Sequence, residues 1–296
     1  MTNSHVLVGA TAVPEQLTIR RIGFADLKDA LRRGIDDFNA MPTHAIFLCA
    51  IYPVIGIVLA QLAFGYSILP LVYPLASGFA LIGPFAALGL YELSRRRELG
   101  QEAAASHAFD VLQSSSIGAI AALGLVLLVV FGIWIDVAYN IYVANFGYAP
   151  PTSLSQFVHD VLTTQAGWTL IIVGNGVGLL FAALVLSIGV MSFPLLVDRD
   201  VGAAVALLTS IQAVAKNPLQ FAAWGLIVAA LLFIGSLPLF LGLTVVLPIL
   251  GHSTWHLYRK VVDADFSPHP QPLPQPSEKR YAADFPVALL PWGKGK

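Results

Sequence analysis

The sequence predicts an all-α, polytopic membrane protein with six transmembrane helices. Three observations support this fold class. The 296-residue chain is 57% hydrophobic and 11% charged, whereas typical soluble domains have about 25% charged residues. Its mean hydropathy is +0.76. Long apolar segments alternate with short polar ones, and the 16 Lys and Arg residues all lie outside the apolar segments. We therefore expect the lipid bilayer as the main partner, and the net charge of −1 gives no reason to expect nucleic acid.

The apolar segments are read as membrane spans, because about 20 residues at ~1.5 Å rise cross a hydrocarbon core of ~30 Å; the segment 219–235 is short for a span. Residues 140–167 form the only sizeable loop between them and contain no Lys or Arg. The spans are expected at about 44–66, 68–91, 117–139, 168–193 and 219–235, with a sixth inside 236–260.

Three amphipathic helices are expected before the odd-numbered spans, at 24–40, 98–114 and 198–216. Their apolar side chains recur at three- and four-residue steps, which is the helical period. Such helices lie in the membrane interface or cover the ends of spans. The expected apolar faces are Phe24, Leu27, Leu31, Ile35 and Phe38 in the first helix, Leu99, Ala103 and Leu112 in the second, and Val201, Val205 and Leu208 in the third.

One amphipathic helix followed by two spans occurs three times, which predicts a cryptic three-unit repeat. All three units enter the membrane from the same side, so the repeat is parallel, unlike the inverted repeats of many transporters. A shift of 176 residues places Ala30 on Ala206, Leu31 on Leu207, Ile35 on Ile211 and Pro42 on Pro218. A shift of 164 residues places Pro84 on Pro248, Tyr91 on Trp255 and Arg95 on Arg259.

Basic residues predict the orientation, because cytoplasmic loops of membrane proteins are enriched in Lys and Arg. Both termini are therefore expected on the cytoplasmic side of a bacterial inner membrane. The chain divides into an N-terminal, poorly ordered cytoplasmic segment (1–21), a six-helix membrane domain (22–262) and a proline-rich, disordered, dispensable cytoplasmic tail (263–296). The expected interface anchors are Arg95, Arg96, Arg97, Arg199, Arg259 and Lys260, with Trp255 in the headgroup layer.

Two histidines form the main candidate site. His252 and His256 are four residues apart and therefore share one face of a helix. They could share a metal ion, as in helical zinc sites, with Glu92 or His44 as a further ligand. His44 is also the only partner for a haem held between two spans. The alternative is that both histidines only hydrogen-bond to neighbours. We expect both to face the bundle interior close to Glu92, and no cofactor is expected.

Three polar residues lie within the predicted spans: Gln61, Asp136 and Asn175. Each is expected to bond to a neighbouring helix or, for Asp136 near the outer surface, to be solvated. If they lined one path, the protein would be a small transporter or channel. Gly174 and Gly176 flank Asn175 and allow close approach of helices. The sequence shows no nucleophile–base pair or phosphate-binding loop, so an enzyme is not predicted.

Three sequence blocks, 73–100, 192–202 and 240–262, resemble the bacterial domain of unknown function 2189 family. Members are described as predicted integral membrane proteins, and some carry a putative cytochrome c oxidase subunit label. The resemblance covers about residues 20–262 and implies a membrane fold, with no established activity. A haem–copper catalytic subunit needs more histidines near its spans than His44, His252 and His256.

These observations favour a non-catalytic integral membrane protein that serves as an accessory or assembly component of a membrane complex, with other subunits as partners. A small transporter or channel is the first alternative. A metal- or haem-binding membrane protein related to a respiratory oxidase is the second.

Overall fold

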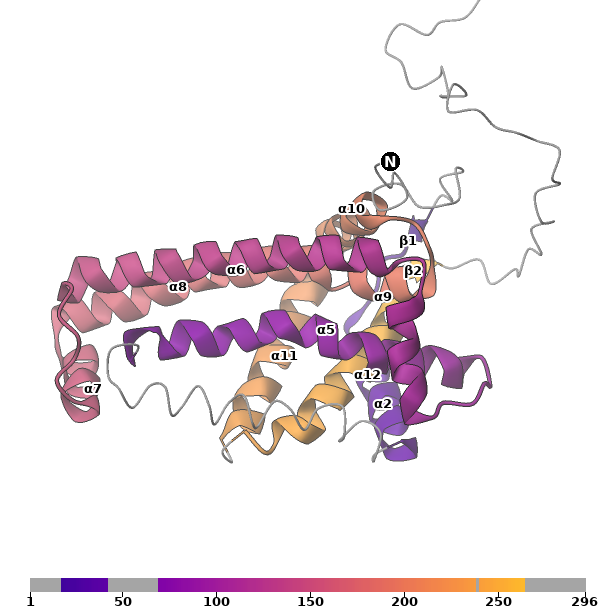
Figure 1. Ribbon diagram of the computed structural model, residues 1–296, viewed down its shortest axis with the longest axis horizontal. Coiled ribbons are helices and arrows are strands. Elements are labelled where there is room, and N and C mark those ends of the chain that lie inside the picture. The colour runs from indigo at the N-terminus through magenta and orange to yellow at the C-terminus, as the bar shows by residue number, and fades with distance from the viewer. Residues whose placement is uncertain (1–16, 42–68, 238–239, 264–296) are drawn as a thin grey trace, which may run out of the picture. The chain divides into compact units, whose positions relative to one another are not determined.

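The computed structural model describes residues 17–41, 69–237 and 240–263. The first predicted span, with His44 and Gln61, and the tail from residue 264 lie outside the described residues. The elements are β1 (Thr18–Ile19), α2 (Phe24–Ala40), η1 (Leu69–Leu71), α5 (Val72–Glu98), η2 (Ala105–Gln113), α6 (Ile117–Phe146), α7 (Leu154–Thr163), α8 (Gln165–Gly189), α9 (Ser192–Asp198), α10 (Ala203–Lys216), α11 (Pro218–Ser236), α12 (Leu243–Val261) and β2 (Val262–Asp263) (Figure 1).

Helices dominate the described part of the chain, as predicted. Among the described residues, three helical stretches are long and apolar enough to cross a membrane: Ile117–Phe146, Gln165–Asp198 and Pro218–Ser236. They coincide with the third, fourth and fifth predicted spans. α5 and α12 lie at the places of the second and sixth predicted spans.

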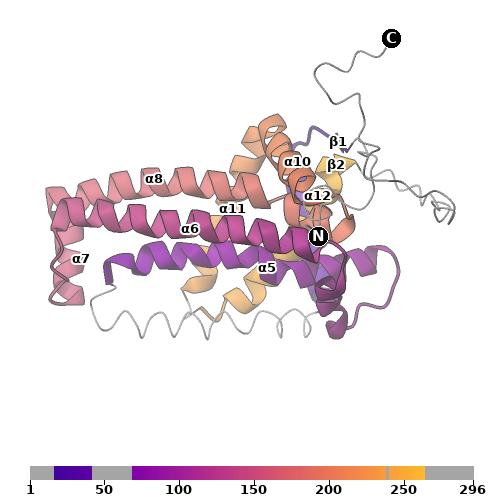
Figure 2. The ribbon, with the colours of Figure 1, turned by 45° about the horizontal axis from the view of Figure 1, so that its top comes forward.

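The long helices α6 and α8 lie side by side and pack along each other (Figures 1 and 2). Trp134 of α6 fixes this pairing. A Cβ atom added at Gly178 of α8 would lie 3.2 Å from the Trp134 ring, so glycine leaves room for the indole. The same ring lies 5.4 Å from the Phe181 ring, and its N–H donates to the Pro74 carbonyl at 3.3 Å. One buried tryptophan thus joins α5, α6 and α8.

The segment between the third and fourth spans is more helical than predicted. Residues 140–146 continue α6, which ends at Gly147 with a φ of 77°. α7 follows within the expected loop, because the Ser153 hydroxyl accepts the Gln156 N–H at 3.1 Å and caps the helix. α7 lies across the ends of α6 and α8 (Figures 1 and 2).

Small side chains dock α2 onto α12. The buried residues of α2 are Leu27, Ala30, Gly34 and Asp37. A Cβ atom added at Gly34 would lie 2.0 Å from Ser253 Oγ and 2.6 Å from its backbone nitrogen. The predicted apolar face is buried only in part: Leu27 is buried, whereas Phe24 is 59% exposed. Close approach of two backbones requires small residues, and Gly34 supplies one at the contact.

The second amphipathic segment is shorter and more tightly wound than predicted. Residues 101–104 are irregular after Gly100, and a 3₁₀ helix, η2, follows. η2 packs against α5, where a Cβ atom added at Gly89 would lie 2.9 Å from Ala108 Cβ. Leu112, expected on the apolar face, is 63% exposed.

The third amphipathic helix, α10, packs against α8 and α9 through small polar groups. The Ser192 hydroxyl donates to the Ala206 carbonyl at 3.1 Å, and Ser210 Oγ accepts the Met191 N–H at 3.1 Å. Leu208, expected on its docking face, is 57% exposed. All three amphipathic segments thus bury mainly small residues, together with Leu27 and Val111, and leave other large apolar residues exposed.

Residues 17–21 have a defined structure, although the sequence prediction assigned them to a poorly ordered segment. β1 pairs antiparallel with β2, with Thr18 opposite Asp263. Asn217 after α10 fixes the next residues, because its side chain accepts the Ile22 N–H at 2.9 Å and donates to the Arg20 carbonyl at 3.0 Å. Backbone pairing and this amide hold a segment whose composition alone gives no sign of structure.

Substituting Gly34 tests the docking of α2. We expect Gly34→Ala to destabilise the protein by about 1–3 kcal/mol, because the added methyl group overpacks the contact with Ser253. The control is Gly132→Ala on α6, where an added Cβ atom meets nothing within 4 Å. Thermal unfolding in mild detergent measures both; equal melting temperatures for the two variants would contradict the docking geometry.

Candidate functional site

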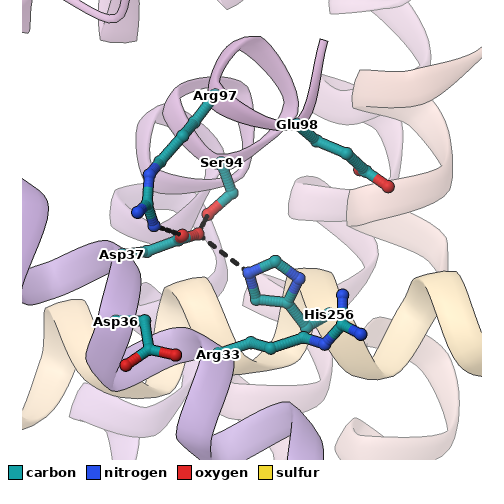
Figure 3. A pocket seen from close by; sticks show the side chains of 7 residues that line it. All are labelled: Arg33, Asp36, Asp37, Ser94, Arg97, Glu98 and His256. Atoms are coloured by element: carbon teal, nitrogen blue, oxygen red, sulfur yellow. Dashed lines mark hydrogen bonds and ion pairs between the residues drawn. The ribbon is translucent and has the colours of Figure 1, made fainter. Parts of the chain in front are cut away.

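Polar side chains gather at one end of the bundle, where α2, α5 and α12 meet; we call it the charged end. Its centre is the carboxylate of Asp37, which is buried. Ser94 Oγ donates to Asp37 Oδ2 at 2.6 Å, and His256 Nε2 lies 2.9 Å from the same oxygen. Arg97 forms an ion pair with Asp37 Oδ1. Figure 3 shows the three side chains converging on this carboxylate.

His252 lies next to this carboxylate and is fully buried. Its Nδ1 atom is 2.7 Å from Ser94 Oγ and 3.9 Å from Asp37 Oδ2. Its other ring nitrogen, Nε2, has no hydrogen-bond partner among the described residues. Ser94 therefore connects the buried histidine to the carboxylate.

The ionisation of Asp37 fixes the direction of these hydrogen bonds. Burial raises the pKa of Asp37, but hydrogen bonds from His256 and Ser94 outweigh it and hold the pKa below its ordinary value. A carboxylate can only accept hydrogen bonds, so the Ser94 hydroxyl donates to Asp37. The Ser94 oxygen then accepts from His252, which places the histidine proton on Nδ1.

This arrangement is not that of an activated serine nucleophile. In that chemistry the hydroxyl proton goes to a histidine nitrogen and the oxygen faces a substrate. Here the hydroxyl proton points to Asp37, and Ser94 is buried. The hydrogen bonds among Asp37, Ser94 and His252 therefore join helices to one another, and the Ser94 oxygen is not activated as a nucleophile.

An open cavity of about 350 Å³ lies beside the Asp37 carboxylate. Asp37, Ser94 and His256 all line the cavity; the His256 side chain is 12% exposed, whereas that of His252 is fully buried. Both charge signs occur in the lining. The residues that line the cavity are Arg33, Asp36, Asp37, Ser94, Arg97, Glu98 and His256 (Figure 3).

Further ion pairs at the charged end join α5 to its neighbours. Glu92 binds Arg95 and Arg96, each at 2.9 Å. Arg96 also reaches Asp110 of η2 at 2.7 Å. These contacts tie the 3₁₀ segment to the end of α5.

A second set of contacts joins α12 to α5, α9 and α2. Arg259 binds Glu98 at 3.1 Å and Asp198 at 3.2 Å. The Tyr258 hydroxyl donates to Asp198 at 2.7 Å. Lys260 binds Asp29 at 2.9 Å, and its hydrogen bond lowers the pKa of Asp29 to about 2.

The structure brings together only some of the predicted site residues. His252 and His256 share the neighbourhood of Asp37, whereas the Glu92 carboxylate bonds to Arg95 and Arg96. Trp255, expected in the headgroup layer, is buried inside the protein and donates to Glu98 at 3.1 Å. Arg259 lies over this ring, 5.6 Å from its centre.

The remaining described candidates are either exposed or have other partners. Asp136 on α6 and Asn175 on α8 are both exposed. The Asn175 amide donates to the Ile171 carbonyl at 2.7 Å within its own helix. Arg199 lies 3.6 Å from Asp198, and its carbonyl accepts the Ser116 hydroxyl. The predicted candidates His44 and Gln61 lie outside the described residues.

Sequence reasoning missed Asp37 and Ser94, which organise the site. A signal for Asp37 existed: it lies three residues after Gly34 and seven after Ala30, on the small-residue face of α2. Ser94 had no comparable signal, because a serine followed by three arginines is typical of the polar end of a helix.

The geometry around the histidines does not present a metal site among the described residues. In that part of the chain, no group of three or more His, Cys, Asp and Glu side chains is placed to hold a metal ion. His252 Nδ1 and His256 Nε2 are engaged by Ser94 and Asp37. The atoms that would bind an ion thus bind protein groups.

Neutralising Asp37 tests its central role. We expect Asp37→Asn to lower stability by about 1–3 kcal/mol, because an amide NH₂ meets the buried donors Ser94 and His256 and leaves one of them unpaired. The control is Asp36→Asn, its exposed neighbour on α2, with an expected change within about 0.5 kcal/mol. Thermal unfolding in detergent compares the two, and equally stable variants would contradict the central position of Asp37.

The comparison with known proteins agrees with the membrane helices. No curated protein and no solved structure matches the chain. A family model does match: residues 72–198, which run from α5 to α9, fit the family described as "Predicted integral membrane protein (DUF2189)". The resemblance predicted from the sequence is therefore confirmed over residues 72–198, which match the model of the DUF2189 family of predicted integral membrane proteins.

Proposed function

We propose that this integral membrane protein is a non-catalytic accessory or assembly component of a membrane complex. The observation that carries the proposal is the exposed face of α8 around Asn175. Asn175 is exposed in the middle of an apolar helix. A polar side chain at such a place is costly against lipid and is normally covered by protein.

Small residues beside Asn175 leave room for another helix. Cβ atoms added at Gly174 and Gly176 would meet nothing within 4 Å. Exposed Ile172 and Leu179 border this gap. Small residues let transmembrane helices approach closely, and amides hydrogen-bond across the contact. This surface, Ile172–Leu179 of α8, therefore suits a transmembrane helix of another subunit, and we call it the α8 patch.

The charged-end cluster supports a non-catalytic role. Its carboxylates and arginines join α2, η2, α5, α9 and α12 to one another. Ser94 lines the cavity, but its hydroxyl donates to Asp37 and is not activated as a nucleophile. The groups thus contribute to the architecture of the helix bundle.

A small transporter is the alternative function, and a specific observation favours it. The open cavity at the charged end is lined by two groups that can carry protons, the buried Asp37 and the partly buried His256. A metal- or haem-binding role has no corresponding support among the described residues.

We also propose the six-span, three-unit parallel arrangement, and the buried faces of the amphipathic helices support it. The four buried residues of α2, Leu27, Ala30, Gly34 and Asp37, shift by 176 onto Ala203, Ala206, Ser210 and Ala213, which are all buried in α10. The residues that follow the two helices also agree: Met41 has φ −134° and ψ 46°, and Asn217 has φ −131° and ψ 51°.

The packing partners of the amphipathic segments support the same repeat. η2 packs on α5, the second span of the first unit, and α10 packs on α8 and α9, the second span of the middle unit. α2 packs on α12, the second span of the last unit. Each amphipathic segment therefore docks on the unit before it, and the first unit closes the ring on the last.

Reporter fusions test the proposed topology. Basic residues lie at the charged end, so both termini are proposed to face the cytoplasm of a bacterium, with its inner membrane as the location. A fusion at Gly147 is expected to report the periplasm, and fusions at Gly100 or after Lys260 the cytoplasm. The reverse pattern would overturn the orientation.

Filling the α8 patch tests the accessory role. We expect Gly174→Leu with Gly176→Leu to release the protein from its complex, because the new side chains prevent close helix approach. The matched control is Gly132→Leu on α6, where the space at the glycine is equally open. Native mass spectrometry after mild detergent extraction measures the assembly. A wild-type protein that is found alone, or only with a second copy of itself, would contradict an accessory role.

A further inference from the structure

Four polar side chains form an unbroken hydrogen-bonded chain at the charged end. His256 Nε2 lies 2.9 Å from Asp37 Oδ2, the Ser94 hydroxyl is 2.6 Å from the same oxygen, and His252 Nδ1 is 2.7 Å from Ser94 Oγ. One end of the chain, His256, lines the open cavity, and the other end, His252, is fully buried. The chain therefore links a solvent-accessible group to the interior of the bundle.

The buried end of this chain has an unused proton acceptor. Because the Ser94 hydroxyl donates to Asp37, its oxygen accepts the Nδ1 proton of His252, and the neutral ring then has a bare lone pair on Nε2. Nε2 has no hydrogen-bond partner among the described residues. An unpartnered nitrogen on a fully buried ring is costly, and such groups in native structures call for an explanation.

We propose that His252, Ser94, Asp37 and His256 form a proton relay between the bundle interior and the cavity at the charged end. In the arrangement that the structure describes, the relay carries protons from His252 toward the cavity. It does not depend on whether another subunit docks on the α8 patch.

Each step of the relay conserves its protons. A hydronium ion that reaches the bundle interior gives its proton to His252 Nε2 and becomes water, and the ring passes its Nδ1 proton to Ser94 Oγ. Ser94 passes its own hydroxyl proton to Asp37 Oδ2, which becomes a carboxylic acid. Asp37 then loses this proton to water in the cavity, or to His256 when the Nε2 atom of that ring is unprotonated. Return of His252 to the Nδ1-protonated tautomer, and of the Ser94 hydroxyl to its first orientation, restores the starting state.

Charged residues around this hydrogen-bonded chain favour proton transfer along it. Arg97 of α5 pairs with Asp37, while Arg33 and Asp36 of α2 and Glu98 of α5 line the cavity beside it. Arg97 stabilises the carboxylate and so favours its deprotonation after each transfer. The acidic residues Asp36 and Glu98 at the cavity lining attract the released proton to solvent.

Nuclear magnetic resonance of the full chain tests the starting state without any substitution. In protein labelled with ¹⁵N-histidine, the ring of His252 is expected to be neutral near pH 7, with its proton on Nδ1. The signal is assigned by its loss in His252→Gln. A proton on Nε2, or a charged ring, would overturn the proposal.

Proton flux into liposomes tests the relay itself. Purified full-length protein is reconstituted with a pH-sensitive dye inside the vesicles, and flux is driven by a potassium gradient with valinomycin. We expect wild-type protein to raise the flux above that of protein-free liposomes. Ser94→Ala is expected to return it to that background, because the methyl group breaks the chain, and Ser94→Thr is expected to restore it.

Ser253→Ala is the matched control for these measurements. Ser253 follows His252 on α12 and is as fully buried as Ser94. Its hydroxyl has no hydrogen-bond partner among the described residues. Its substitution is expected to leave the flux unchanged. The proposal is wrong if wild-type liposomes show only background flux, or if Ser94→Ala conducts as well as wild type.

Discussion

The buried carboxylate of Asp37 is the interaction on which the charged end depends. It belongs to α2, yet it accepts from Ser94 of α5 and contacts His256 of α12 and Arg97 of α5. A charge in the protein interior is tolerated only when its hydrogen-bonding capacity is satisfied. Three helices that are far apart in the sequence must therefore stay together to satisfy one carboxylate. The same requirement places His252 against Ser94 and leaves its second nitrogen unpartnered.

Close backbone approach is the second constraint, and it explains which residues face which. α2 reaches α12 only because Gly34 has no side chain opposite Ser253, and η2 reaches α5 at Gly89 for the same reason. Several large apolar side chains of these segments, such as Phe24 and Leu112, are exposed. In a membrane protein these exposed side chains suit the interface, where an amphipathic segment places its apolar face against lipid. The amphipathic segments thus use one face for protein and another for the membrane.

The site was only partly predictable, and the missing part has a physical reason. His252 and His256 stood out because their four-residue spacing places them on one helical face, and the structure does place both near one acidic group. The acidic group is Asp37, whereas the expected neighbour Glu92 bonds to Arg95 and Arg96 within its own helix. A shift between repeats aligns residues by depth along the helix, but it contains no information on which way each side chain points. Trp255 illustrates the same limit, because an aromatic residue near a span end suits the headgroup layer as well as a buried contact with Arg259.

The sequence by itself determined the helical membrane class, the positions of the third, fourth and fifth spans, and the resemblance to the DUF2189 family, because hydropathy and basic clusters are local properties of the chain. It also predicted helices near 24–40 and 198–216 from their period. Only the tertiary structure decided which faces of these helices are buried, that residues 18–20 join the bundle through Val261, Val262 and Asn217, and that Asp37 and Ser94 organise the charged end. Those features depend on contacts between residues that are far apart in the sequence. His256 and Asp37, for example, are 219 positions apart. Local periodicity predicts that a helix forms. Which residue each side chain contacts depends on how closely two backbones can pack.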